Sequence, residues 1–142
     1  MKPELSKRSS WWIPKERYYE LKHFCLQYDL WKKAYERIDI QANDPSKVIV
    51  AKTEHFDPIQ AAVESKEKWY EKIHMVDWAC DYATSYAFSI KKPEEAKLLK
   101  EAVTKGYSFE KMEARYSTFP VSRDAYYESY RRFFWILDKV RD

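Results

Sequence analysis

Glycine is almost absent from this sequence of 142 residues, in which Gly106 is the only one. Glycine-rich phosphate loops, dinucleotide-binding fingerprints and tight hairpin turns all depend on glycine, so these sites are almost excluded. Cysteine is also scarce: Cys25 and Cys80 stand far apart and form no CxxC motif. We therefore expect two buried thiols that behave as small apolar residues, with no disulfide framework and no zinc site.

Long apolar runs are missing as well. No stretch approaches the roughly 20 apolar residues that cross a bilayer, and no apolar region follows the basic first ten residues as it would in a signal peptide. Hydrophobic residues make up 45% and charged residues 35%, which is typical of a globular domain. We therefore expect a cytoplasmic protein with no membrane partner. The net charge of +3 permits binding to nucleic acid without requiring it.

Aromatic residues are unusually frequent at 18%, with 12 tyrosines and 6 tryptophans. A domain of this size does not easily bury so many rings, so some are expected at the surface. Exposed tyrosine and tryptophan favour partner interfaces or stacking surfaces.

The spacing of apolar residues predicts an all-α fold, a helical bundle with one long central helix and a C-terminal helix-turn-helix-like unit. We expect one domain over 1–142, made of an N-terminal helical and oligomerisation region (13–92) and a helix-turn-helix-like region (93–142). The first helix is expected to start at Pro14, and the pattern leaves a break or a continuation open at Tyr28–Asp29. Residues from about 39 to 57 are expected to form a loop, with Val48–Ala51 as the one strand-like run.

The long helix is expected to start at Pro58, after Asp57 as a cap, and to run to about Ile90. Apolar residues recur along it at alternating steps of four and three, a heptad-type pattern interrupted only by Lys66. This stripe indicates a central core helix, and part of it can also serve a dimer interface. The interface residues predicted on this helix are Trp69, Ile73, Val76 and Ala83.

Three further helices are expected in the C-terminal region. Pro93 starts the first, and Gly106 follows it as a C′ glycine. Ser108 caps a short helix that ends at Tyr116, and Ser122 caps the final helix. That last helix is expected to bury Tyr126, Tyr130, Phe133, Leu137 and Val140. Phe134 and Trp135 fall away from this face, so we predict that they contact another copy of the chain, RNA polymerase or another host protein.

A short helix, a tight turn and a longer helix form the arrangement of a helix-turn-helix. In that motif the start of the second helix meets the major groove, where side-chain donors reach base edges or phosphates. The backbone N–H groups of the helix start add a phosphate site. The predicted DNA-binding residues are Ser122, Arg123 and Tyr127 at the helix start, with Arg131 and Arg132 further along.

The segment from Phe119 to Lys139, FPVSRDAYYESYRRFFWILDK, resembles the C-terminal signature of phage and prophage late-gene regulators of the ArpU and RinA type. Asp124 departs from the Ser or Thr of that signature, and the run Ile13–Tyr28 resembles phage-associated proteins of Gram-positive bacteria. The middle of the chain shows no such likeness. The matching residues are Pro120, Val121, Ser122, Arg123, Tyr126, Tyr127, Arg131, Arg132, Phe133 and Phe134.

The resemblance implies a phage-derived DNA-binding transcriptional regulator with a fold similar to region 4 of sigma factors. Its partner would be double-stranded DNA, its place the cytoplasm of the bacterial host cell, and its state a homo-oligomer such as a dimer. The alternative is a phage protein-binding module, such as an anti-CRISPR-like inhibitor of a host defence complex or a small-terminase-like packaging component.

Catalysis is not expected, and neither is a cofactor. The one pattern with catalytic chemistry is a pair of E-x-x-H motifs, Glu20 with His23 and Glu71 with His74, which occur twice in di-iron helical bundles. A second pair of inward glutamates is not evident, so we predict no metal site. Cys25 and His23 lie on nearly opposite sides of a helix and cannot form a nucleophile–base pair.

Overall fold

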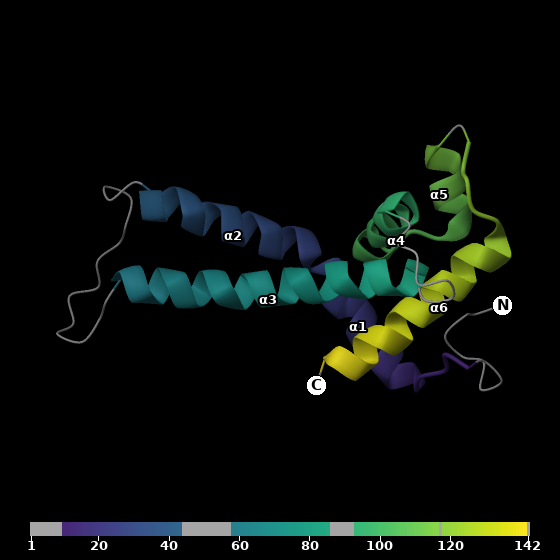
Figure 1. Ribbon diagram of the computed structural model, residues 1–142, viewed down its shortest axis with the longest axis horizontal. Coiled ribbons are helices and arrows are strands. Elements are labelled where there is room, and N and C mark those ends of the chain that lie inside the picture. The colour runs from purple at the N-terminus through teal and green to yellow at the C-terminus, as the bar shows by residue number, and fades with distance from the viewer. Residues whose placement is uncertain (1–9, 44–57, 86–92, 117, 142) are drawn as a thin grey trace. The chain divides into compact units, whose positions relative to one another are not determined.

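The computed structural model describes residues 10–43, 58–85, 93–116 and 118–141, and within these ranges it contains helices and no strand. The prediction of an all-α fold with one long helix is confirmed. No helix of the described ranges combines the length and apolar character needed to span a membrane. The helices are α1 (Lys15–Leu26), α2 (Tyr28–Asn43), α3 (Pro58–Ser85), α4 (Pro93–Lys105), α5 (Phe109–Arg115) and α6 (Arg123–Val140) (Figure 1).

The chain divides into two compact units. Unit 1 comprises residues 1–27 and 75–142, and therefore holds α1, the last part of α3, α4, α5 and α6. Unit 2 comprises residues 28–74, with α2 and the first part of α3. Within unit 1, α1 contacts both α4 and α6, so the packing does not follow the division expected at residue 92.

The N-terminal helix boundaries differ slightly from those expected. Pro14 is the residue before α1, and its carbonyl accepts a hydrogen bond from the Tyr18 N–H at 2.9 Å. Of the two alternatives near Tyr28, the structure shows a break, because Gln27 forms a turn between α1 and α2. The expected start of a loop at residue 39 is wrong: α2 continues to Asn43, because 39–43 contain no glycine or proline to stop it. The rest of that loop, with Val48–Ala51, lies outside the described residues.

The later helix ends follow the local signals of the sequence. α3 begins at Pro58, as expected, and its expected end near Ile90 lies outside the described residues. Gly106 has a φ of +72° and ends α4, with the N–H of Tyr107 donating to the Ala102 carbonyl at 2.9 Å. This is the Schellman arrangement, which needs a residue of left-handed conformation after the helix. The Ser108 hydroxyl accepts from the Lys111 N–H and caps α5.

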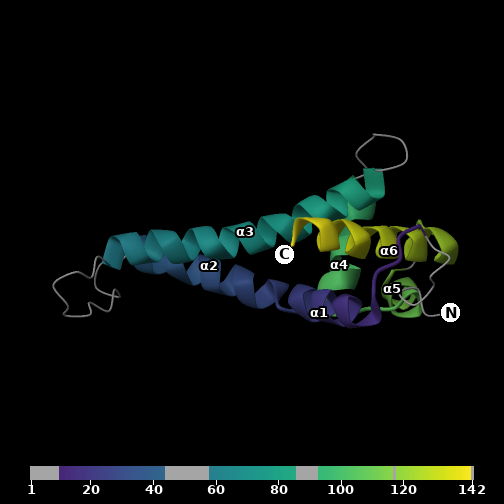
Figure 2. The ribbon, with the colours of Figure 1, turned by 90° about the horizontal axis from the view of Figure 1, so that it is seen from below.

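The core of unit 1 is built around α6, which contacts α1, α4 and α5 (Figure 2). Tyr18 of α1 packs edge-on against Phe134, with ring centroids 5.0 Å apart. Its hydroxyl also shares a buried 3.0 Å hydrogen bond with that of Tyr130. Neighbours on several sides bury more of α6 than one apolar face. Its buried residues are Tyr126, Tyr130, Phe133, Phe134, Ile136 and Leu137.

The burial of α6 differs from the expectation at two residues. Phe134 was expected to fall away from the buried face, yet it is only 2% exposed because it faces α1. Val140 was expected in the core and is 38% exposed, since it lies at the C-terminal end of α6. The sequence-based prediction assumed that α6 buries a single apolar face. A helix with neighbours on several sides buries more than one face, so that assumption does not apply here.

Unit 2 pairs α2 with the first part of α3 through aromatic and lysine side chains. Tyr35 of α2 lies near Tyr70 of α3, with ring centroids 6.4 Å apart, and the Lys66 ammonium sits over the Tyr35 ring at 5.1 Å. Lys72 contacts the rings of both Trp31 and Trp69. Such cation–π contacts let lysine stems cover aromatic surface while the charges stay hydrated.

Candidate nucleic-acid interface

The α5–α6 pair contains the predicted helix-turn-helix residues, and its connection spans residues 116–122. This connection is longer than the turn of about three or four residues of a typical helix-turn-helix. Phe119 of the connection packs inward: its ring lies near those of Phe109 and Tyr126, with centroids 5.7 and 6.4 Å away. The connection is thus held by its own side chains and not by a turn glycine.

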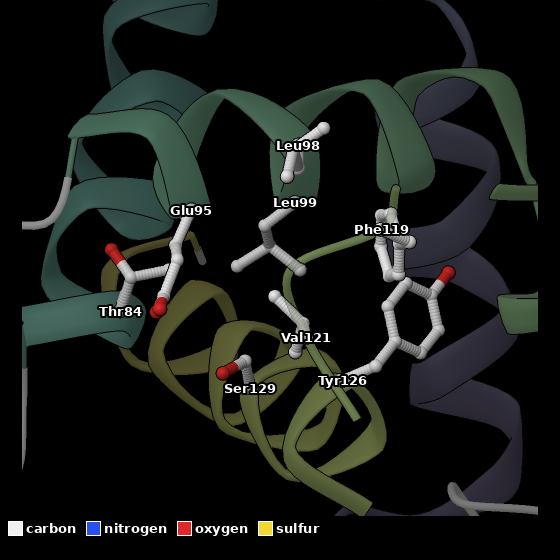
Figure 3. Close-up of a pocket in the computed structure, with 8 residues that line it drawn as sticks. All are labelled: Thr84, Glu95, Leu98, Leu99, Phe119, Val121, Tyr126 and Ser129. Atoms are coloured by element: carbon white, nitrogen blue, oxygen red, sulfur yellow. The ribbon is translucent and has the colours of Figure 1, made fainter. Parts of the chain in front are cut away.

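A small pocket lies between this connection, α4, α6 and the end of α3 (Figure 3). Its volume of about 20 Å³ holds little more than one water molecule, which is too small for a cofactor. We therefore interpret it as a gap in the side-chain packing beneath the connection. It is lined by Thr84, Glu95, Leu98, Leu99, Phe119, Val121, Tyr126 and Ser129.

The start of α6 faces solvent, with residues 122–125 all exposed. The Ser122 hydroxyl accepts a 3.2 Å hydrogen bond from the Ala125 N–H, which confirms the predicted cap. Arg123 is the first helical residue, and 58% of its side chain is exposed. Its guanidinium pairs with the carboxylate of Glu110 in α5 and lies 5.7 Å from the centre of the Tyr127 ring.

Tyr127 is partly buried and ties α6 to the start of α5. Its hydroxyl accepts a long hydrogen bond, 3.4 Å, from the Phe109 N–H. The neighbouring Tyr126 is buried and donates to the Tyr107 carbonyl at 2.6 Å. Burial, together with the nearby Tyr127 phenol, raises the pKa of Tyr126 well above its ordinary value. The ring and hydroxyl of Tyr127 are therefore partly engaged within the protein, whereas Arg123 is the more accessible side chain.

Arg131 and Arg132 do not have the exposure that the sequence interpretation gave them. Their side chains are only 13% and 12% exposed, and both pair with Glu128. Arg132 also donates to the Ala83 carbonyl at the end of α3, at 2.7 Å. Glu128 in turn accepts a 2.7 Å hydrogen bond from the Trp11 indole. Arg132 thus joins α6 to α3, Glu128 joins α6 to the N-terminal segment, and Arg131 pairs within α6. The low exposure of both arginines corrects their assignment to a DNA-facing surface.

Several residues of the predicted oligomer interface are also buried within the chain. Val76 and Ala83 of the unit 1 part of α3 are fully buried, and Phe134 of α6 nearly so, all within the core of unit 1. They cannot contact a second copy of the folded chain. Trp69, Ile73 and Trp135 keep partial exposure, with Trp135 packed edge-on against Trp11 at 5.2 Å.

Two exposed aromatic pairs on α3 were not singled out from the sequence. Trp78 and Tyr82, in unit 1, stack at 5.2 Å and are 41% and 45% exposed. Tyr70 and His74, in unit 2, stack at 5.6 Å, and Tyr70 is 53% exposed. Each pair has i, i+4 spacing, which places both rings on one side of a helix. Aromatic residues four positions apart and outside the heptad stripe were the sequence signal that could have identified both pairs.

Glu20 and the two cysteines, which were considered for chemistry from the sequence, are paired or buried in the structure. Glu20 of one E-x-x-H motif pairs with Arg17 and with Arg141, whose hydrogen bond lowers the pKa of Glu20. In the described residues no group of three possible ligands is placed to hold a metal ion. Cys25 and Cys80 are both buried, as predicted, and desolvation raises both thiol pKa values.

Comparisons with protein-family models, with curated proteins and with solved structures find no match to this chain.

Proposed function

We propose that this chain is a phage-derived, DNA-binding transcriptional regulator that contacts duplex DNA through the exposed start of α6. The observation that carries the proposal is the accessibility of Ser122 and Arg123 at that helix start. The first backbone N–H groups of a helix have no partner within it, so they can donate to a phosphate. The likeness of Phe119–Lys139 to late-gene regulators supports the same site.

The electrostatics of this surface favour modest affinity. Lys111, Arg115 and Arg123 are exposed on α5 and α6, but so are Glu110, Glu113 and Asp124. A surface with as many acidic as basic groups binds a polyanion weakly unless geometry selects particular contacts. We therefore assign the leading contact to Arg123, supported by the helix N-terminus, and we assign none to Arg131 or Arg132.

The test compares Arg123→Ala with Lys97→Ala, a matched loss of one exposed positive charge on α4. Titrations at low salt of labelled duplex DNA from a phage late promoter should show binding weakened about tenfold for Arg123→Ala and less than about twofold for Lys97→Ala. Both variants should melt as the wild type does, because both side chains are exposed. Equal affinities for the two variants and the wild type would contradict the proposal.

A second candidate function is a protein-binding module, such as an inhibitor of a host defence complex or a packaging component. The stacked and exposed Trp78–Tyr82 pair favours it, because large exposed rings are typical of protein interfaces. In a pull-down from host lysate, the wild type should retain one stoichiometric protein, and the double variant Trp78→Ala with Tyr82→Ala should lose it. That result, together with no DNA binding by the wild type, would favour this function.

We also propose that the chain forms a homodimer. The predicted interface residues that keep partial exposure support this proposal, and they are Trp69, Ile73 and Trp135. Light scattering at several concentrations tests it, and a Trp69→Ala variant should shift the protein toward the monomer.

A further inference from the structure

The ion pair between Arg123 and Glu110 links the first turns of α5 and α6 at the surface proposed to meet DNA. Glu110 lies in the first turn of α5, after the Ser108 cap, and Arg123 is the first residue of α6. Both side chains are more than half exposed, at 58% for Arg123 and 56% for Glu110. The pair therefore lies in water, where such a contact adds little to stability.

The same ion pair should affect the binding of a negatively charged ligand more than it affects the stability of the fold. A guanidinium has five N–H donors, and only Nη1 of Arg123 engages the carboxylate. A DNA phosphate arriving at Arg123 meets both a partly neutralised guanidinium and the repulsion of Glu110. It must take the place of that carboxylate, or bind beside it.

We propose that Glu110 is a specificity-determining residue, one that holds Arg123 in the absence of DNA and lowers the affinity for duplexes of arbitrary sequence. The inference rests on the proposed function. A duplex whose phosphates or base edges fit the α5–α6 surface releases Arg123 from Glu110, whereas a poorly fitting duplex does not. Specificity of this kind comes from a repulsive element beside the attractive one.

The test uses Glu110→Gln, which keeps the shape of the side chain and removes its charge. Anisotropy titrations with a fluorescein-labelled duplex of mixed sequence at low salt should show affinity raised about fivefold. Glu113→Gln, an exposed glutamate on the same helix, is the matched control and should change affinity less than about twofold. The melting curve of Glu113→Gln should coincide with that of the wild type, and Glu110→Gln should melt only slightly lower, because the lost charge is exposed but lies in the first turn of α5.

A double variant separates a local effect from a change in net charge. If Glu110 acts through Arg123, the gain from Glu110→Gln disappears when it is combined with Arg123→Gln. A gain that persists in the double variant, or that Glu113→Gln matches, overturns the inference while leaving DNA binding intact. Absence of DNA binding by the wild type and by Glu110→Gln overturns both this inference and the proposed function.

Discussion

Gly106 is the residue at which backbone conformation places the strictest demand on side-chain choice. Its φ of +72° lies in the left-handed region that other residues adopt only at a cost, and it ends α4 where the chain turns toward α5. A Cβ added here would also lie 3.2 Å from Cδ2 of Leu26. That atom belongs to the end of a flexible, 39% exposed side chain, which can move aside. Backbone strain therefore dominates the effect of a substitution.

We expect Gly106→Ala to lower the free energy of unfolding by about 1–2 kcal/mol, because alanine is strained in the left-handed conformation. Gly106→Asn should lose less, since asparagine tolerates that conformation better than alanine does. Urea denaturation of the two variants measures the difference. Equal losses would point to a clash with Leu26 and not to the backbone.

At the scale of the element, α6 combines a structural and a proposed functional role. Its buried face organises the core of unit 1, while its first turn is exposed and capped by Ser122. Because the cap and the proposed phosphate contact involve the same serine, a simple truncation would affect both. Substitutions that keep the cap but change the charge separate the two roles.

Ser122→Ala should lower the free energy of unfolding by about 1 kcal/mol, the usual loss when a helix cap is removed. Ser122→Asp should keep the stability, since aspartate caps helices as well as serine does, and its charge suits the helix start. The same charge should weaken duplex DNA binding, because it repels phosphate. Urea denaturation and DNA titration give the two readouts. Unchanged DNA binding by Ser122→Asp would place the DNA contact elsewhere.

At the scale of the whole molecule, Glu128 is the acidic centre that holds distant parts of unit 1 together. It accepts from the Trp11 indole and pairs with Arg131 and Arg132, the second of which reaches the end of α3. Partial burial raises the pKa of this carboxyl, but the hydrogen bonds from Trp11 and Arg131 outweigh it. The resulting pKa of Glu128 is lower than its ordinary value of 4.5.

A lowered pKa in the folded state makes stability depend on pH. The contribution of Glu128 is complete above about pH 4.5, where the unfolded chain is also ionised, and is lost as the pH falls through the lower folded pKa. We expect Glu128→Gln to reduce stability at neutral pH, since two largely buried arginines lose their carboxylate. The variant should also lose less stability on acidification than the wild type does.

Urea midpoints at neutral and acidic pH measure this difference, with Glu113→Gln as an exposed control. Some acid sensitivity should remain in Glu128→Gln, because the pKa of Glu20 is lowered as well. Parallel acid curves for Glu128→Gln and the wild type would show that Glu128 does not contribute in this way.

The helix boundaries depend on local signals, and the sequence alone determined most of them. Pro58 at a helix start, Gly106 after a helix end and the serine caps Ser108 and Ser122 all act within a few residues of their own position. Each satisfies backbone groups or conformations of its own turn, so its effect is readable without knowledge of the rest of the chain. The burial of both cysteines followed from their type in the same way.

Only the tertiary structure decided which side of each helix remained exposed. Arg131, Arg132 and Phe134 occupy positions that would face solvent if α6 had one neighbour, and they are covered because α6 has several. The accessible Arg123 and its contact with Glu110 likewise depend on how α5 and α6 meet across residues 116–122. Helical periodicity specifies which residues share a face, whereas long-range packing specifies what covers that face.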